Sequence, residues 1–200
     1  MFSRPPPATL ALLAANIGVF LLQMVTGDAV VEHFALWPTG TPLFTPWQLV
    51  TYAFLHDTHT LAHIFFNMFA LFMFAPQLEL LWGSRRFMVY YFVCVLCAGL
   101  AQLAVTSLTG TLYPTLGASG AVFGVLLAFA LFFPQQRIAI YGVIPMPAWL
   151  FVTLYGVLEL VLGVTNTQAG VAHFAHLGGM LGGALLIFFW RAQGSTRRQF

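Results

Sequence analysis

Six long apolar runs constrain what this chain can fold into. They cover residues 8–26, 61–82, 86–108, 118–134, 146–163 and 171–191. Each is close to the ~20 residues that an α-helix needs to cross the hydrocarbon core of a bilayer. We therefore predict an all-α, polytopic membrane protein, with six transmembrane helices in a single membrane domain over residues 1–200.

The composition fits a chain whose surface faces lipid. Only 6% of the residues are charged and 60% are hydrophobic, whereas about a quarter of the residues of an average soluble protein are charged. The chain has no lysine, and its arginines are scattered rather than gathered into a basic cluster. The lipid bilayer is therefore the expected partner, and binding to nucleic acid is excluded.

The arginines predict how the chain crosses the membrane. They lie before the first run, between the second and third, between the fourth and fifth, and after the last: Arg4, Arg85, Arg86, Arg137, Arg191, Arg197 and Arg198. The connections at 27–60, 109–117 and 164–170 contain no basic residue. Because basic loops stay in the cytoplasm, we expect both termini there. The long, aromatic-rich connection 27–60 is expected to lie in the membrane interface.

Polar side chains within the spans are the candidates for function, because burying a polar group in hydrocarbon is unfavourable unless it has a partner or a task. The candidates are His63, Asn67, Glu79, Ser119, Glu159, His173 and His176. Spans two, four and six run in the same direction, so position within the span measures depth. By this measure His63, Ser119 and His176 lie within about 6 Å of one another in depth. Asn67 lies one turn below His63.

Ser119 is the candidate nucleophile of this layer. It opens its helix after Gly117, where backbone N–H groups without intrahelical partners and the positive end of the helix dipole would stabilise an oxyanion. His63 and Asn67 could donate hydrogen bonds to the same anion. A serine here can also be a simple helix N-cap, and the histidines at the same depth are what favour catalysis.

Glycines predict close packing between spans four and six. Ser119 is followed by a G-x-x-x-G pattern at Gly120–Gly124, and His176 is followed by two overlapping copies that begin at Gly178 and Gly179. Small residues at this spacing let two helix backbones approach. Because such faces also occur between inert helices, the pattern supports the site without defining it.

His176 is the candidate general base, since an imidazole titrates near neutral pH and can pass a proton from a hydroxyl to a leaving amine. No carboxylate is expected at its depth, so we predict a Ser119–His176 dyad rather than a triad. His173, one turn nearer the surface, is the rival base, and the alternative for it is a solvated or loop-facing histidine.

The two acidic candidates have structural interpretations. Glu79 lies near Arg85 and Arg86, so an ion pair at the cytoplasmic helix end is expected. For Glu159 we expect a hydrogen bond to a neighbouring helix or loop.

Three motifs together resemble the rhomboid family of intramembrane serine proteases. The family pattern G-x-S-G is present at Gly117–Gly120, A-H-x-x-G at Ala175–Gly179, and H-x-x-x-N at His63–Asn67. They occur in the family order, and the resemblance covers residues 8–191. It implies a six-helix rhomboid-like bundle of the minimal bacterial type. The implied location is the bacterial inner (plasma) membrane, with the active site toward the outer side.

The resemblance also implies an activity. Peptide bonds in or near the transmembrane segments of membrane protein substrates would be hydrolysed through Ser119 and His176, with no metal and no cofactor. The backbone N–H of Ser119, with His63 and Asn67, would form the oxyanion hole. Supporting roles would fall to Gly117, Gly120, Phe123 and Gly179, of which Phe123 takes the place of a tyrosine that often stacks on the catalytic imidazole. Neither the particular substrate nor the oligomeric state follows from the resemblance.

Two departures from the family pattern affect details. Gln48 stands where the family usually has an arginine, so the anchoring of the first loop is expected to differ. His173 stands where a small or polar residue is usual, so the pH dependence is expected to differ.

Two alternatives belong to other functional classes. His56, His59 and His63 have a helical spacing that metal sites use, although residues 56–60 read more as loop than as helix. A non-catalytic rhomboid-like chaperone or a small transporter is the other alternative. Inactive relatives usually lack the serine or the histidine, and such transporters tend to contain paired half-repeats, neither of which describes this chain.

Overall fold

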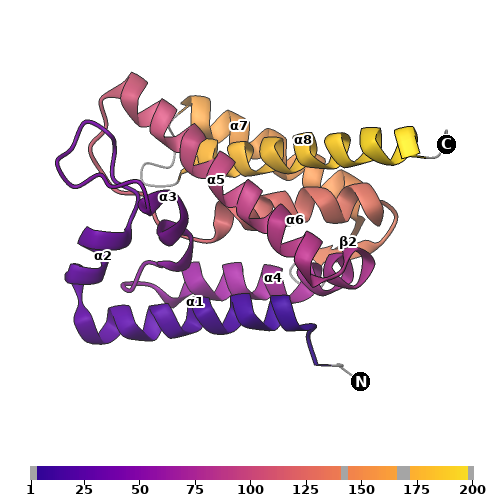
Figure 1. Cartoon of the computed structure of the whole chain (residues 1–200), viewed down its shortest axis with the longest axis horizontal. Helices are drawn as coiled ribbons and strands as arrows, with labels where there is room; N and C mark the ends of the chain where they lie inside the picture. Colours follow the sequence, from indigo (N-terminus) through magenta and orange to yellow (C-terminus); the bar gives the residue numbers. More distant parts are fainter. Residues whose placement is uncertain (1–3, 141–143, 166–171, 198–200) are drawn as a thin grey trace.

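The protein is a bundle of helices that run back and forth along one axis (Figure 1). The computed structural model describes residues 4–140, 144–165 and 172–197. In these ranges, five helices are long and apolar enough to cross a membrane. They are α1 (Pro7–Thr26), α4 (Leu61–Trp82), α5 (Ser84–Thr109), α7 (Ala148–Thr165) and α8 (His173–Arg197). The prediction of an all-α, multi-pass integral membrane protein is confirmed.

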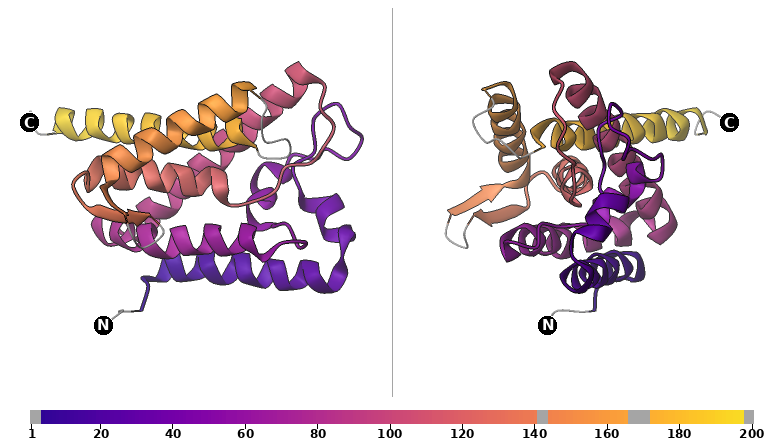
Figure 2. Two further views of the ribbon diagram at one scale, coloured as in Figure 1. Left: turned by 180° about the vertical axis from the view of Figure 1, so that it is seen from behind. Right: turned by 90° about the vertical axis from the view of Figure 1, so that its left-hand side faces the viewer.

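The remaining apolar helix, α6 (Ser119–Phe132), is shorter than the span predicted over 118–134. Its 14 residues rise only about 21 Å, against a hydrocarbon thickness of ~30 Å. It lies in the middle of the bundle (Figure 2), in contact with α4, α5, α7 and α8, and most of its residues are buried. Gly117 and Ala118, the two residues directly before Ser119, are also buried, so the irregular backbone that enters α6 is covered by protein at this point.

The first connection supports the start of α6. It contains α2 (Asp28–Phe34), α3 (Gln48–Thr51) and the 3₁₀ turn η1 (Tyr52–Phe54). Leu36 and Thr115 exchange two backbone hydrogen bonds of 2.9 Å, and the N–H of Gly117 donates to the carbonyl oxygen of Tyr52 over 2.9 Å. The Tyr52 hydroxyl in turn donates to the carbonyl oxygen of Val95 on α5, at 2.8 Å. The segment before Ser119 is therefore tied to the connection and through it to α5.

Gln48 organises this connection through hydrogen bonds of its side-chain amide. Its side chain is buried. The amide oxygen accepts hydrogen bonds from the backbone N–H groups of Trp37 and Thr45, each at 3.2 Å, and the amide nitrogen donates to the carbonyl oxygen of Leu43 at 2.9 Å. A neutral amide thus links two separate parts of the connection, at Trp37 and at residues 43–45, without a buried charge.

Close packing of α6 against α8 is present as predicted. A Cβ added at Gly179 would overlap the carbonyl oxygen of Gly120, and one added at Gly120 would overlap Ala98 of α5. A Cβ at Gly178 would lie 2.9 Å from the carbonyl oxygen of Cys97. Glycine at these positions lets α8 approach both neighbours within backbone contact.

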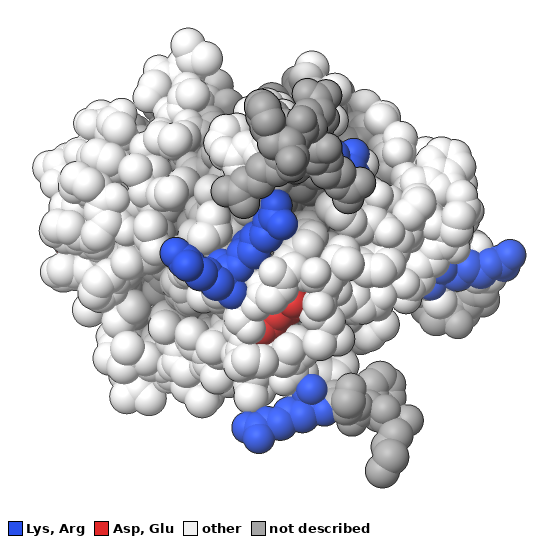
Figure 3. All heavy atoms as spheres, turned by 45° about the vertical axis from the view of Figure 1, so that its right-hand side comes forward, with Lys and Arg blue, Asp and Glu red and all other residues white. Residues whose placement is uncertain are grey.

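The start of α1 and the end of α8 lie at the same end of the bundle (Figure 1), and Figure 3 shows arginine side chains spread over this end. Arg86 lies over the ring of Trp190 with its guanidinium carbon 4.2 Å from the ring centre, and Arg191 lies 5.5 Å from the ring centre of Phe132. A two-stranded antiparallel hairpin that the sequence did not predict, β1 (Arg137–Ile140) with β2 (Ile144–Pro147), joins α6 to α7.

The predicted ion pair of Glu79 with an arginine is wrong. Its carboxylate accepts hydrogen bonds from the backbone N–H groups of Ala8 and Thr9, at 2.8 and 2.7 Å, and from the hydroxyls of Thr9 and Ser84, at 2.7 and 2.6 Å. The N-terminus of α1 carries unpaired N–H groups and the positive end of the helix dipole. The start of α1 is therefore a favourable partner for the Glu79 carboxylate, whereas an arginine at the helix end can be solvated by water instead.

Candidate active site

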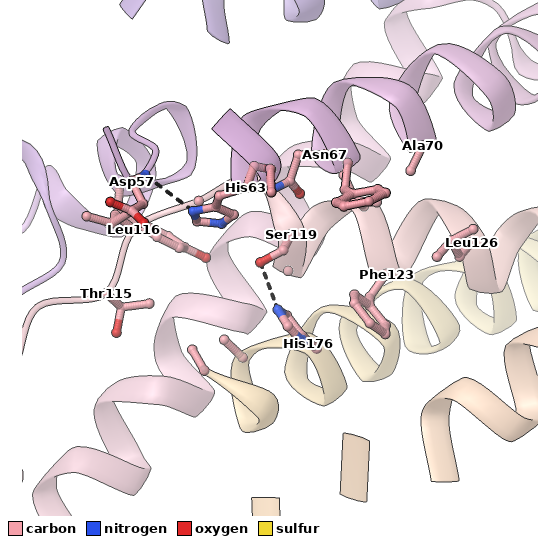
Figure 4. Close-up of a pocket in the computed structure, with 18 of the residues that line it drawn as sticks. Asp57, His63, Asn67, Ala70, Thr115, Leu116, Ser119, Phe123, Leu126 and His176 are labelled. Carbon is pink, nitrogen blue, oxygen red and sulfur yellow. Dashed lines mark hydrogen bonds between the residues drawn. The ribbon is translucent and has the colours of Figure 1, made fainter. Parts of the chain in front are cut away.

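Ser119 and His176 meet at the contact between α6 and α8 (Figure 4). The Ser119 Oγ atom lies 2.8 Å from Nε2 of His176, although 57 residues separate the two in the chain. Ser119 is the first residue of α6 and is half-buried, and His176 lies in the first turn of α8 and is 8% exposed. The close approach of the two helices brings the hydroxyl within hydrogen-bond reach of the imidazole.

The His176 ring is held from its face by Phe123. The two rings stack in parallel, with centres 4.3 Å apart and an angle of 6° between their planes. Phe123 lies one turn after Ser119 on α6, so the same helix carries the hydroxyl and the surface on which the imidazole rests. Tyr155 of α7 packs behind Phe123, with ring centres 4.9 Å apart.

Glu159 contacts the other side of the His176 ring, which corrects the prediction that no carboxylate lies at this depth. Its Oε2 atom is 2.8 Å from Nδ1 of His176 and 2.7 Å from Nδ1 of His173. All three side chains are buried. His173 is therefore neither solvated nor loop-facing. Its ring contacts Glu159, and the ring that contacts Ser119 is that of His176. The expectation of a hydrogen bond from Glu159 to a neighbouring helix is confirmed.

A signal for this contact was present in the sequence. Span five runs outward, so depth along it is counted back from its outer end. Glu159 lies four residues before the predicted end at 163, and His176 lies five residues after the predicted start at 171. At 1.5 Å per residue the two depths agree within about 2 Å.

His63 and Asn67 line the space on the opposite side of Ser119. The backbone N–H of Asp57 donates to Nδ1 of His63 at 3.3 Å, so the proton of the neutral His63 ring lies on Nε2. The Asn67 amide donates to the carbonyl oxygen of His63 at 2.9 Å. An N–H of His63 is thus available on the side of the ring that faces the start of α6.

Gly117 separates His63 from Ser119, and only glycine fits there. Its φ is +129°, a conformation that residues with a side chain rarely adopt. A Cβ at this position would lie 2.8 Å from Nε2 of His63 and 3.6 Å from Oγ of Ser119. The two polar atoms therefore flank one small space that a side chain would fill.

These side chains border a cavity of about 740 Å³. Its polar lining comes from several helices and from the connections before α4 and α6, while apolar side chains of α4 and α6 form much of the remaining wall (Figure 4). The lining includes His63, Phe66, Asn67, Ser119, Leu126, Tyr155 and His176. A cavity of this size next to a serine–histidine pair can admit a peptide segment.

The fold does not bring together His56, His59 and His63, the three histidines considered as an alternative metal site. His56 is buried against His63, with ring centres 5.1 Å apart, whereas His59 is exposed. The described residues bring three donor groups together elsewhere, within 4.8 Å of one another, at Glu159, His173 and His176. The short hydrogen bonds between the carboxylate and the two rings engage the same donor atoms.

The fold and the site define a class: a multi-pass helical membrane protein in which a serine hydroxyl is hydrogen-bonded to a histidine ring beside an internal cavity. A family model described as the Rhomboid domain matches residues 44–193. The chain belongs to the rhomboid family, which confirms the resemblance seen in the motifs.

Individual relatives carry the same family name. The Rhomboid protease GlpG of Yersinia pseudotuberculosis is 28% identical over 197 residues, which are 98% of this chain and 66% of that protein. The proteins of the same name from Yersinia pestis and Yersinia enterocolitica are 28% and 29% identical over the same shares. The chain thus spans slightly less than two thirds of the length of these relatives.

Proposed function

We propose that this protein is an intramembrane serine endopeptidase that cleaves peptide bonds in or near the transmembrane segments of membrane proteins. One observation carries the proposal: the Oγ atom of Ser119 lies 2.8 Å from Nε2 of His176, beside a cavity within the bundle. The name of the rhomboid protease relatives supports the same activity.

In this proposal Ser119 is the nucleophile and His176 the general base. The hydroxyl proton moves from Oγ to Nε2 as Oγ attacks the scissile carbonyl carbon, and the same proton then passes to the leaving amine. A water molecule, activated by the same imidazole, hydrolyses the acyl-enzyme. Stacking on Phe123 limits the ring to a narrow range of orientations, so little reorganisation is needed before each transfer.

The oxyanion of the tetrahedral intermediate would lie at the start of α6. The backbone N–H of Ser119 belongs to the first helical turn, where such groups have no intrahelical acceptor. Nε2–H of His63 flanks the same space, and the Asn67 amide lies one turn away on the cavity wall. The helix dipole adds further stabilisation of negative charge.

The proposed orientation puts both termini in the cytoplasm of a bacterium and the site toward the outer half of the inner membrane. The presence of arginines at the end of the bundle that holds the termini supports it (Figure 3). Gly117, Gly120, Phe123 and Gly179 are proposed to support the site, and no metal or cofactor takes part in the steps.

A fluorophosphonate probe tests the nucleophile directly. Purified wild-type protein, Ser119→Ala and His176→Ala would be labelled in detergent after circular dichroism has confirmed that each is helical. We expect labelling of the wild type alone, with the adduct on Ser119 by mass spectrometry. Reconstitution with single-span membrane proteins would then show cleavage products from wild type only. Cleavage by Ser119→Ala at the wild-type rate would reject the proposal.

A further inference from the structure

Glu159 lies where a catalytic histidine has its orienting partner. Its Oε2 atom is 2.8 Å from Nδ1 of His176, while the opposite ring nitrogen, Nε2, is 2.8 Å from Oγ of Ser119. The three groups come from α7, α8 and α6, so the contact depends on how these helices pack. Glu159 is 4% exposed, which means that its carboxylate is oriented by protein rather than by water.

A carboxylate at this position determines the tautomer of His176. An ionised carboxylate only accepts hydrogen bonds, so the neutral ring must carry its proton on Nδ1. Nε2 then has a lone pair that points at the Ser119 hydroxyl. The other tautomer would point an N–H at the hydroxyl and leave no base for its proton.

His173 holds the same carboxylate oxygen from a second direction. Its Nδ1 atom lies 2.7 Å from Oε2 of Glu159, and its ring is turned 87° from that of His176. Its Nε2 atom is buried and has no hydrogen-bond partner in the described part of the chain. A buried unpaired N–H is rarer than an unpaired acceptor, so His173 also donates through Nδ1, and two donors orient one oxygen.

We propose that Glu159 is a positioning residue that completes a Ser119–His176–Glu159 triad. The inference rests on the proposed function and goes beyond the serine–histidine dyad. Glu159 would orient the imidazole and stabilise the imidazolium that forms when Nε2 takes the proton from Oγ. That proton passes on to the leaving amine, and Glu159 keeps its negative charge throughout.

The length of these hydrogen bonds supports a charged acceptor. Distances of 2.7 and 2.8 Å fall in the range of charge-assisted bonds between nitrogen and an ionised oxygen. His63 also faces His176, from across the cavity on α4. An imidazole supplies no negative charge, whereas the Glu159 carboxylate lies at hydrogen-bond distance from Nδ1 and can stabilise the imidazolium.

Labelling kinetics with the fluorophosphonate probe test the inference. We expect Glu159→Gln to lower the maximal labelling rate by on the order of 10²- to 10⁴-fold, with the half-saturating probe concentration within about threefold of wild type. Glu159→Asp restores the charge and should label at least about tenfold faster than Glu159→Gln. Glu79→Gln is the matched control, since it neutralises a buried carboxylate at the far end of the bundle, and it should label at the wild-type rate.

The outcomes separate this inference from the proposed function. Equal maximal labelling rates for wild type and Glu159→Gln would overturn the triad but leave the Ser119–His176 assignment standing. The same conclusion would follow if folded Glu159→Asp labelled no faster than folded Glu159→Gln. Absence of labelling in folded wild-type protein overturns both proposals.

A measurement on the unaltered protein covers the case in which Glu159→Gln does not fold. Nuclear magnetic resonance of protein with ¹⁵N-labelled histidine reports which ring nitrogen carries the proton, and the His176→Ala variant assigns the signals. Protonated Nδ1 in neutral His176 supports the triad. A proton on Nε2 overturns it.

Discussion

Gly179 of α8 faces the carbonyl oxygen of Gly120 in α6 so closely that no Cβ fits between them. This contact sets the separation of the two helices that carry His176 and Ser119. We expect Gly179→Ala to push the helices apart and to lower fluorophosphonate labelling by about 10²-fold, the effect that a 1 Å displacement can have. Gly18→Ala is the control, because an added Cβ there meets nothing within 4 Å. Equal labelling of both variants would contradict this account of the contact.

Asn67→Ala should lower the rate of substrate cleavage by on the order of 10² to 10³, the usual effect of losing one oxyanion donor. The loss of a hydrogen bond within the helix has to be separated from this effect. Asn16→Ala provides the comparison, since the Asn16 amide also donates to the carbonyl four residues earlier, at 2.8 Å. An Asn67→Ala rate equal to that of Asn16→Ala would remove Asn67 from the oxyanion hole.

Glu79→Ala should destabilise the protein without altering the site. The substitution removes a charged acceptor from the N-terminus of α1 and from Ser84, and hydrogen bonds to charged groups contribute about 1.5–3 kcal/mol each. We expect the free energy of unfolding to fall by about 3 kcal/mol, measured by thermal or denaturant unfolding in detergent. The folded fraction should still label at Ser119. An unchanged midpoint would show that α1 is held by other contacts.

Acid should weaken the fold through His56. Burial, with the neighbouring His63, lowers the pKa of His56 from 6.5 to about 4. Between these values the unfolded chain binds more protons than the folded one, so this contribution to stability is complete above pH 6.5 and decreases as the pH falls toward 4. Asp57 and Gln23 are the other polar neighbours, and Gln23 contacts only the His56 backbone.

The unfolding midpoint at pH 7 and pH 4.5 measures this effect. The drop in the midpoint should be smaller in His56→Phe than in wild type, because the variant has no ring to protonate. The same drop in both proteins would show that other groups carry the acid sensitivity.

Chelation should leave activity unchanged. In the proposed mechanism Glu159, His173 and His176 act through the hydrogen bonds that join them, so dialysis against EDTA should not alter the labelling rate. Loss of labelling that Zn²⁺ restores would instead assign these residues to a metal, and metal analysis of the purified protein would show the corresponding stoichiometry.

Several features of the protein follow from the sequence alone. Length and hydropathy determine the membrane spans, since each helix must satisfy its own backbone in lipid whatever its neighbours are. The G-x-x-x-G faces after Ser119 and His176 indicate which helices approach. Spans two, four and six cross the membrane in the same direction, so comparing the positions of Ser119, His176 and His63 within their spans was enough to group these residues at one depth.

Other features depend on contacts of α1 and α7 with the rest of the bundle, and these the sequence did not reveal. The partner of Glu79 is the start of α1, 70 residues away in the chain, and an arginine six or seven positions along was the nearer but wrong choice. The short α6 is surrounded by α4, α5, α7 and α8, an arrangement that depends on the packing of the whole bundle.

The contact between Glu159 and His176 shows most clearly which features the sequence determines and which depend on the tertiary structure. The sequence determined that each residue is polar and lies within a span, and it contained a signal of their similar depth that the prediction of a dyad without a carboxylate missed. Only the tertiary structure decided that α7 and α8 turn these side chains toward each other, with His173 on the same oxygen. The reason is physical: depth and polarity are local properties of one helix, whereas rotation about the helix axis is set by packing against all its neighbours at once.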